Sequence, residues 1–378
     1  MRNNSDLKFN PIRFDMIGCN GSVGAMGENS NFLRSALSQN IVYSVRREAL
    51  PINEIADMLG VSPVYVESEA EFLAENGFLI QNGRTYISNC LISEPDEEQA
   101  FTELHDSMYI QAAELIAPEL FDALFENAKQ IENGIICPRN DTNFLLWSLV
   151  PYVAAACDNK AMPNAISFEE ATTLRPDGGQ NICVCSVTSH IAKLPLYQSS
   201  MQYMSGPCWN SRDDFTLWLV DTEWSARRVG DPDSTIGRDC DLLNHYLRSD
   251  MLSKDELVHL ISRGYLKHGK PSPKEADALQ IVWVKGTQAK ARLMKIGEAI
   301  KDKHRAKLDQ LKAPFINAVL DATPPHLKKA QGFCLQSIFY SDGWFLLHCL
   351  KNLVNSGKLK LPTEDQRKSL TAVAITDD

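Results

Sequence analysis

The sequence predicts a mostly helical α+β protein, and three observations carry this prediction. Apolar residues recur at helical spacing over most of residues 31–156. Runs rich in β-branched and aromatic residues follow in the middle of the chain, where 215–224 reads FTLWLVDTEW. Helical spacing returns after residue 239. We therefore expect an N-terminal helical module with a hairpin, then an α+β domain with an antiparallel sheet, then a helical C-terminal region.

Length and composition limit the class of protein. A chain of 378 residues, 44% hydrophobic and 23% charged, predicts two or three globular domains rather than a disordered or fibrous protein. The longest apolar stretch, 144–156, is shorter than the ~20 residues of a membrane helix. The start MRNNSDLKFNP lacks the apolar core of a secretory signal. We expect a cytoplasmic protein that does not contact membrane.

Residues 1–30 are rich in glycine and asparagine. Glycines at 18, 21, 24 and 27 match neither GxGxxG nor GxxxxGK[ST], and no lysine follows to meet a phosphate. The segment is therefore expected to be irregular and to pack against the first helix.

Residues 31–92 predict three helices and a hairpin. Helical spacing covers 31–48 and 52–59, and Gly60 then marks a stop. Ser62 and Pro63 suit the cap and first turn of a third helix that ends near Gly77. Two short strands, 78–80 and 84–88, flank an Asn-Gly turn.

This order of elements predicts a winged helix-turn-helix domain. The stretch LPINEIADMLGVS (50–62), followed by Val66, Leu73 and Gly77-Phe78-Leu79, resembles bacterial winged helix-turn-helix transcriptional regulators. The resemblance covers about residues 31–90 and implies binding to double-stranded DNA through the third helix and the wing. The DNA-binding residues expected on this basis are Ser62, Tyr65 and Ser68 at the bases and Arg84, Arg46 and Arg47 at phosphates.

The third helix departs from that pattern in its charge. Residues 63–76 hold four glutamates and no basic residue, which is repulsive toward phosphate. This favours an alternative in which the acidic winged helix docks a basic protein partner of the transcription machinery.

Residues 97–160 predict a helical connector, and the middle of the chain predicts strands. Pro118 is expected to divide the first connector helix, and 143–156 forms another. An α+β effector or oligomerisation domain is expected over 160–285, with strands at 182–188, 200–209, 215–224 and 279–284. Its aromatic residues either line a small-molecule effector pocket or, as we favour, form the core of the sheet. The pocket candidates are Tyr203, Trp209, Trp218 and Trp224.

Residues 286–378 predict a helical region, with a last helix at 344–355 and a strand at 371–375. The long helix from residue 287 is rich in lysine and arginine but also carries Glu298, Asp302 and Asp309. A solvated, salt-bridged face is therefore favoured over phosphate binding. We also consider a homodimer in which these basic helices add to the DNA affinity.

The motifs of catalysis and metal binding do not occur in the sequence. There is no HExxH, GxSxG or CxxC, so we expect neither an enzyme, nor a metal, nor a cofactor. Cys183 and Cys185 would share one face of a strand, an arrangement that suits a metal or a disulfide, although a buried strand is favoured. The resulting hypothesis is a transcriptional regulator with an N-terminal winged helix and a C-terminal effector or oligomerisation region.

Overall fold

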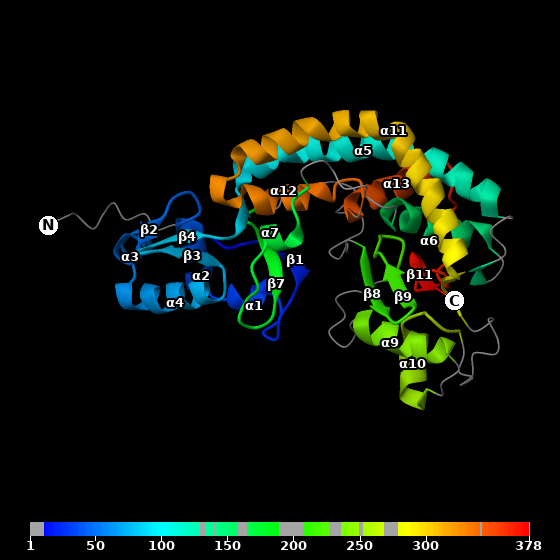
Figure 1. Cartoon of the computed structure of the whole chain (residues 1–378), viewed down its shortest axis with the longest axis horizontal. Helices are drawn as coiled ribbons and strands as arrows, with labels where there is room; N and C mark the ends of the chain where they lie inside the picture. The colour runs from blue at the N-terminus through cyan, green and yellow to red at the C-terminus, as the bar shows by residue number, and fades with distance from the viewer. Residues whose placement is uncertain are drawn as a thin grey trace. The chain divides into compact units, whose positions relative to one another are not determined.

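The protein is an α+β protein with several small sheets among longer helices (Figure 1). The computed structural model describes residues 11–128, 134–138, 141–156, 165–188, 207–226, 236–248, 252–267, 279–340 and 342–377. No helix among these residues combines the length and the apolar character needed to cross a membrane.

The chain divides into two compact units, each assembled from three stretches of sequence. Unit 1 comprises Met1–Leu104, Ala161–Lys193 and Pro314–Gln336. Unit 2 comprises His105–Lys160, Leu194–Ala313 and Ser337–Asp378. The sequence predicts consecutive domains instead, because local spacing does not reveal which distant segments pair. Residues 160–285, expected as one domain, are shared between the units.

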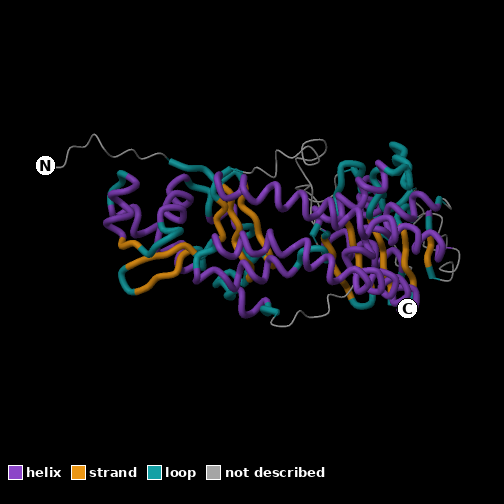
Figure 2. Tube along the Cα trace, turned by 90° about the horizontal axis from the view of Figure 1, so that it is seen from above, coloured by secondary structure: helices purple, strands orange, loops and turns teal. Residues whose placement is uncertain are grey.

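Unit 1 contains two three-stranded sheets, drawn in orange with the other strands in Figure 2. One sheet has the order β1-β7-β5 and the other β2-β4-β3. Its strands are β1 Met16–Ser22, β2 Leu50–Pro51, β3 Leu79–Asn82, β4 Thr85–Ser88, β5 Leu91–Ser93 and β7 Gln180–Ser186. Its helices are α1 Asn29–Phe32, α2 Ala36–Ser44, α3 Ile52–Leu59, α4 Pro63–Glu75, α7 Phe168–Ala171, the 3-10 turn η4 Pro325–Leu327 and α12 Lys328–Gln336.

The expectation of an irregular segment before residue 31 is wrong for residues 16–22. These residues form β1, which pairs antiparallel with β7 from Met16↔Ser186 to Ser22↔Gln180. The strand is polar and glycine-rich, and its hydrogen-bonding partner lies about 160 residues later in the chain. Local sequence therefore carries little signal for it.

The structure contains two helices, α1 and α2, where the sequence predicts one helix over 31–48. Helix α1 ends at its C-cap Leu33, and Ser35 then starts α2 by accepting a hydrogen bond from the Ser38 N–H. A serine N-cap satisfies a backbone donor that the helix itself leaves unpaired, which explains the restart.

Strand β7 separates two apolar clusters of unit 1. Cys183 and Cys185 join the cluster formed by α1–α4 and the β2-β4-β3 sheet. Ile182 and Val184 lie in a smaller cluster with Leu327. This alternation arises because successive side chains of a strand point to opposite faces. One face of β7 therefore packs into the core of the β2-β4-β3 sheet.

Unit 2 is built on a five-stranded sheet of order β6-β10-β11-β9-β8. The sheet is mixed, not antiparallel as expected, because β10 and β11 run parallel. The long connection of residues 286–371 between these two strands permits a parallel pair. The strands are β6 Ile135–Ile136, β8 Cys208–Arg212, β9 Phe215–Leu219, β10 Val282–Lys285 and β11 Ala372–Thr376.

Three of the predicted strands need further correction. The strand expected at 182–188 is β7, Gln180–Ser186, which belongs to unit 1 and not to this sheet. The strand expected at 200–209 begins at Cys208, and residues 201–206 lie outside the described ones. Strand β8 continues to Arg212, and the strand expected at 215–224 ends at Leu219 as β9.

The helices packed in unit 2 include α6 and α13, whose contacts bring residues 142–156 next to residues 343–355. Lys303 and His304 of α11 (Thr287–Ala322) bond the Glu119 carboxylate of α5 (Pro95–Ala128), with nitrogen–oxygen distances of 2.8 and 2.7 Å. The unit 2 helices are α6 Thr142–Ala156, α9 Ile236–Leu247, α10 Lys254–Ser262 and α13 Gly343–Asn355. Helices α5 Pro95–Ala128 and α11 Thr287–Ala322 have residues in both units.

Pro118 does not divide α5, contrary to expectation. The helix continues through it to Ala128. Its neighbours Ala117 and Leu120 are buried, at 0% and 1% exposure. Burial of these residues offsets the hydrogen bond that a proline removes from a helix interior, which costs about 3 kcal/mol.

Candidate functional site

Helices α3 and α4 are held at a fixed angle by the residues between them. Gly60 ends α3 with φ of +64°, a left-handed conformation that glycine adopts without strain. Ser62 has the backbone conformation of an N-cap, although its hydroxyl accepts no capping hydrogen bond, and Pro63 opens α4. Because Val66, Ala70 and Leu73 face the core, the opposite side of α4 faces solvent.

Four apolar side chains are exposed across this turn. Val64 and Tyr65 are 70% and 69% exposed, and Met58 and Val61 are 50% and 36% exposed. We call these four residues the α3–α4 patch. Neighbouring exposed apolar side chains on a folded protein are typical of an interaction surface.

The α3–α4 patch lies in an acidic stretch of the chain. Residues 48–83 contain seven acidic residues and no lysine or arginine. Burial, together with the charges of Glu71 and Glu67 on α4, raises the pKa of the Tyr86 hydroxyl on β4. The stretch therefore combines four exposed apolar side chains with a net negative charge.

The residues expected at DNA bases are all accessible. Ser62, Tyr65 and Ser68 are exposed on the outer side of α4 and its cap. Arg84 is exposed in the turn that joins β3 to β4, directly after Gly83, whose φ is +62°. The structure thus brings four of the six predicted residues onto the exposed surface of one small module.

The other two, Arg46 and Arg47, lie in ion pairs. Arg46 makes two bonds to Glu94, with nitrogen–oxygen distances of 2.7 and 3.2 Å. Arg47 bonds both Glu94 at 3.0 Å and Glu97 at 2.5 Å. Hydrogen bonding from Arg46 holds the pKa of Glu94 below its usual value, so the carboxylate remains charged.

The acidic residues at the start of α5 are a sequence signal for these ion pairs, although the sequence motifs above do not include it. Glu94, Glu97 and Glu98 stand at or just before the first turn of α5, where negative charge is favoured by the helix dipole. Acidic residues that start a helix are natural partners for arginines of the same unit.

Comparison with family models, curated proteins and solved structures gave no match. Evidence for function therefore comes from the geometry of the chain itself. Among the described residues, no group of three or more His, Cys, Asp or Glu has an arrangement that could hold a metal ion.

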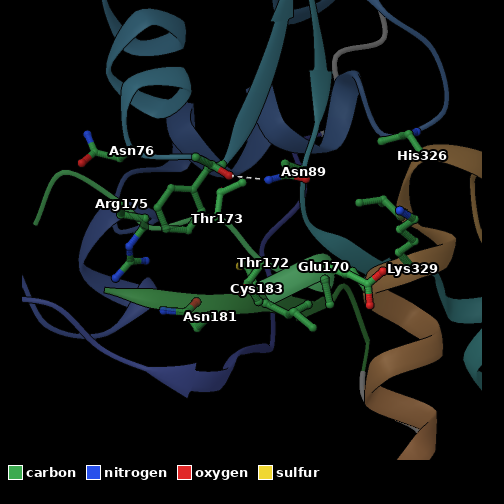
Figure 3. Close-up of a pocket in the computed structure, with 16 residues that line it drawn as sticks. Asn76, Asn89, Glu170, Thr172, Thr173, Arg175, Asn181, Cys183, His326 and Lys329 are labelled. Carbon is green, nitrogen blue, oxygen red and sulfur yellow. Dashed lines mark hydrogen bonds between the residues drawn. The ribbon is translucent and has the colours of Figure 1, made fainter. Parts of the chain in front are cut away.

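A polar cavity of about 190 Å³ lies in unit 1 (Figure 3). Arg175, Glu170 and Lys329 contribute charged groups to its walls, and Cys183 contributes a thiol. Arg175 is already held by Asp177 at 3.2 Å and by Asn29 at 2.8 Å, so it stabilises the wall.

An aromatic cavity of about 270 Å³ lies in unit 2. Trp209 and Trp218, which are paired across β8 and β9, line it together with Tyr152, and Lys290 lies at its border. Trp224 instead packs against Trp147, with ring centroids 5.1 Å apart. Of the four predicted pocket residues the structure brings two together, and Tyr203 lies outside the described residues.

Proposed function

We propose that residues 29–93 form a winged-helix module whose α3–α4 patch binds a basic segment of a partner protein. On this proposal the chain is a non-enzymatic regulator that acts by protein contact, and the resemblance to transcriptional regulators suggests a partner in the transcription machinery. The observation that carries the proposal is the exposure of four apolar residues within an acidic stretch of the chain.

Charge supports a basic partner. The seven acidic residues of 48–83 are unopposed by any lysine or arginine within that stretch. Negative charge attracts a positively charged partner and repels a phosphate backbone. Because the long stems of lysine and arginine are themselves apolar, a basic amphipathic segment suits both the apolar side chains of the patch and the negative charge of the stretch.

The ion pairs of Arg46 and Arg47 also favour protein over DNA. Moving either guanidinium to a phosphate would break its bonds to the Glu94 carboxylate. A phosphate contact would therefore replace existing bonds and add little net binding energy.

Double-stranded DNA is the second candidate partner. The observation in its favour is the joint exposure of Ser62, Tyr65, Ser68 and Arg84. In a winged helix these positions correspond to the third helix and the wing, which meet the groove and the backbone.

Fluorescence anisotropy of the full chain with three probes distinguishes the two candidates. The probes are a leucine–lysine amphipathic peptide, a leucine–glutamate peptide of equal length and a DNA duplex. We expect binding of the lysine peptide alone. The double variant V64S/Y65A should weaken it about tenfold, which corresponds to about 1.4 kcal/mol.

Charge reversal tests specificity. E67K/E71K should abolish binding of the lysine peptide, whereas E103K/E114K, which removes equal charge from exposed positions of α5, should preserve it. DNA binding that weakens steeply with salt and is lost in R84E, with no peptide binding, would overturn the proposal in favour of DNA.

A further inference from the structure

Three thiols meet inside unit 1, although they are far apart in sequence. The sulfur atoms of Cys183 and Cys185 on β7 are 3.7 Å apart. Cys90, which directly precedes β5, interacts through its thiol with both. All three are buried, with exposures of 1%, 6% and 0% for Cys90, Cys183 and Cys185.

The strand register places Cys90 beside Cys183. Strands β5 and β7 are parallel, and Leu91 pairs with Val184. The preceding residues of the two strands, Cys90 and Cys183, are therefore neighbours across the sheet. Neighbouring strands lie about 4.8 Å apart, within the Cα separation of about 4.4–6.8 Å that a disulfide spans.

Cys183 and Cys185 are less suited to each other. Two residues separated by one position along a strand have Cα atoms about 6.6 Å apart, near the upper limit for a disulfide. The cross-strand pair thus has the more favourable geometry.

The polar cavity gives small molecules a route to these thiols. Cys183 lines it, and so do Phe78 and Asn89 (Figure 3). The Cys90 sulfur lies 3.8 Å from the carbonyl oxygen of Phe78, and Cys90 follows Asn89 in the chain, so it adjoins two residues of the wall. A molecule the size of hydrogen peroxide in the cavity therefore stands next to the thiol cluster.

We propose that Cys90 and Cys183 form a peroxide-reactive pair that closes a disulfide between β5 and β7. In the first step the Cys90 thiolate attacks one peroxide oxygen, the O–O bond breaks, and a sulfenic acid and hydroxide result. In the second, the Cys183 sulfur attacks the Cys90 sulfur, the S–O bond breaks, and water leaves with the thiol proton. The proton released when the Cys90 thiolate forms converts the hydroxide to water. The sum is two thiols and one peroxide giving one disulfide and two waters, with sulfur oxidised and peroxide reduced.

Hydrogen bonding supports Cys90 as the attacking group. Hydrogen bonds from Cys183, Cys185 and Ser88 lower the pKa of the Cys90 thiol despite its burial. The same interactions raise the pKa of Cys183, so the proton stays on the second thiol until it attacks. The thiolate is the reactive form of cysteine, so this difference directs peroxide to Cys90.

Peptide mapping by mass spectrometry tests the pair. The full chain is treated with one equivalent of hydrogen peroxide, denatured, alkylated and digested. We expect a peptide containing Cys90 linked to the peptide of β7, while the exposed Cys19 remains available for alkylation. Dithiothreitol should restore alkylation of both linked residues.

Single variants identify the partner of Cys90. C185S should retain the link and C183S should lose it, and far-UV circular dichroism verifies that each variant is folded. A link in C183S, a link confined to Cys183 and Cys185, or a fully alkylated wild-type cluster would overturn the proposal. None of these results depends on the α3–α4 patch, so this inference stands or falls separately from the proposed function.

Discussion

Arg46 and Glu94 form a two-bond ion pair that joins the end of α2 to the start of α5 within unit 1. The guanidinium also lies 3.8 Å from the centroid of the Tyr43 ring and donates to the Tyr43 carbonyl oxygen at 2.9 Å. Both side chains are about one-quarter exposed, at 24% and 21%. The pair is thus partly shielded from water and fixed on several sides.

Replacement of Glu94 by Gln should lower the free energy of unfolding by about 1 kcal/mol at pH 7. Because the pKa of Glu94 is lower in the folded state than its ordinary value of 4.5, its contribution is present above that value. It disappears as pH falls below it, since the protonated carboxyl no longer pairs with arginine. Urea denaturation of E94Q and wild type at pH 7 and at acid pH should show a difference that shrinks on acidification. A pH-independent difference would contradict this account.

Leu73 and Val64 lie on opposite sides of α4, and their substitution should affect stability very differently. Leu73 is fully buried, so L73A should lower the free energy of unfolding by about 3 kcal/mol. Val64 is 70% exposed, so V64A should change it by less than about 0.5 kcal/mol. Denaturation followed by far-UV circular dichroism measures both. Equal losses would show that α4 is oriented differently.

Gly60 should tolerate asparagine better than alanine. Its φ of +64° disfavours a side chain, but no atom lies within 4 Å of the position that a Cβ would occupy. The cost of G60A is therefore one of backbone conformation alone, about 1 kcal/mol. G60N should cost less, because asparagine enters the left-handed region more readily. Equal stability of G60A and wild type would contradict the left-handed turn.

Asp239 is a fully buried carboxylate in unit 2. It bonds His259 at 2.7 Å, Arg263 at 3.3 Å and the Tyr265 hydroxyl at 3.0 Å. D239N removes the negative charge that faces Arg263 and should destabilise unit 2 by about 3 kcal/mol. All six tryptophans lie in the stretches of unit 2, so tryptophan fluorescence during urea denaturation reports on this unit.

A control for this substitution is D255N, at an exposed position in the first turn of α10. It should cost no more than about 0.5 kcal/mol, the effect of one charge at a helix end. A fluorescence transition in D239N that matches this control would show that the Asp239 contacts are unimportant.

Elements with strong local signals could be predicted from the sequence. Helices α3 and α4 follow from Gly60, Ser62 and Pro63, and the last helix and strand were placed within one residue of α13 and β11. These signals are local because a cap, a fixed proline φ or a left-handed glycine acts within one helical turn.

Features that depend on distant partners could not be predicted. Three contacts join segments that are far apart in the sequence, so hydrophobic periodicity does not reveal them. They are the pairing of β1 with β7, the proximity of Cys90 to Cys183 and the ion pair of Arg46 with Glu94. Exposure of Ser62 and Tyr65 did follow from the helix, because residues that avoid the core face must point outward. The sequence could not predict that Trp209 and Trp218 line one cavity, because this depends on the strand register that pairs them.

The discontinuity of unit 1 has a consequence for how the chain is made. Synthesis proceeds from the N-terminus, so α1–α4 leave the ribosome well before β7 and α12 exist. Until then β1 has no antiparallel neighbour, and the face of the core that Cys183 and Cys185 later cover is open. The nascent chain therefore presents an unpaired strand edge and exposed apolar surface while the roughly 160 residues between β1 and β7 are synthesised, a state that favours chaperone binding. A fragment cut after β5 would retain that exposed face permanently, so solubility studies of the N-terminal module should include residues 161–193 and 314–336.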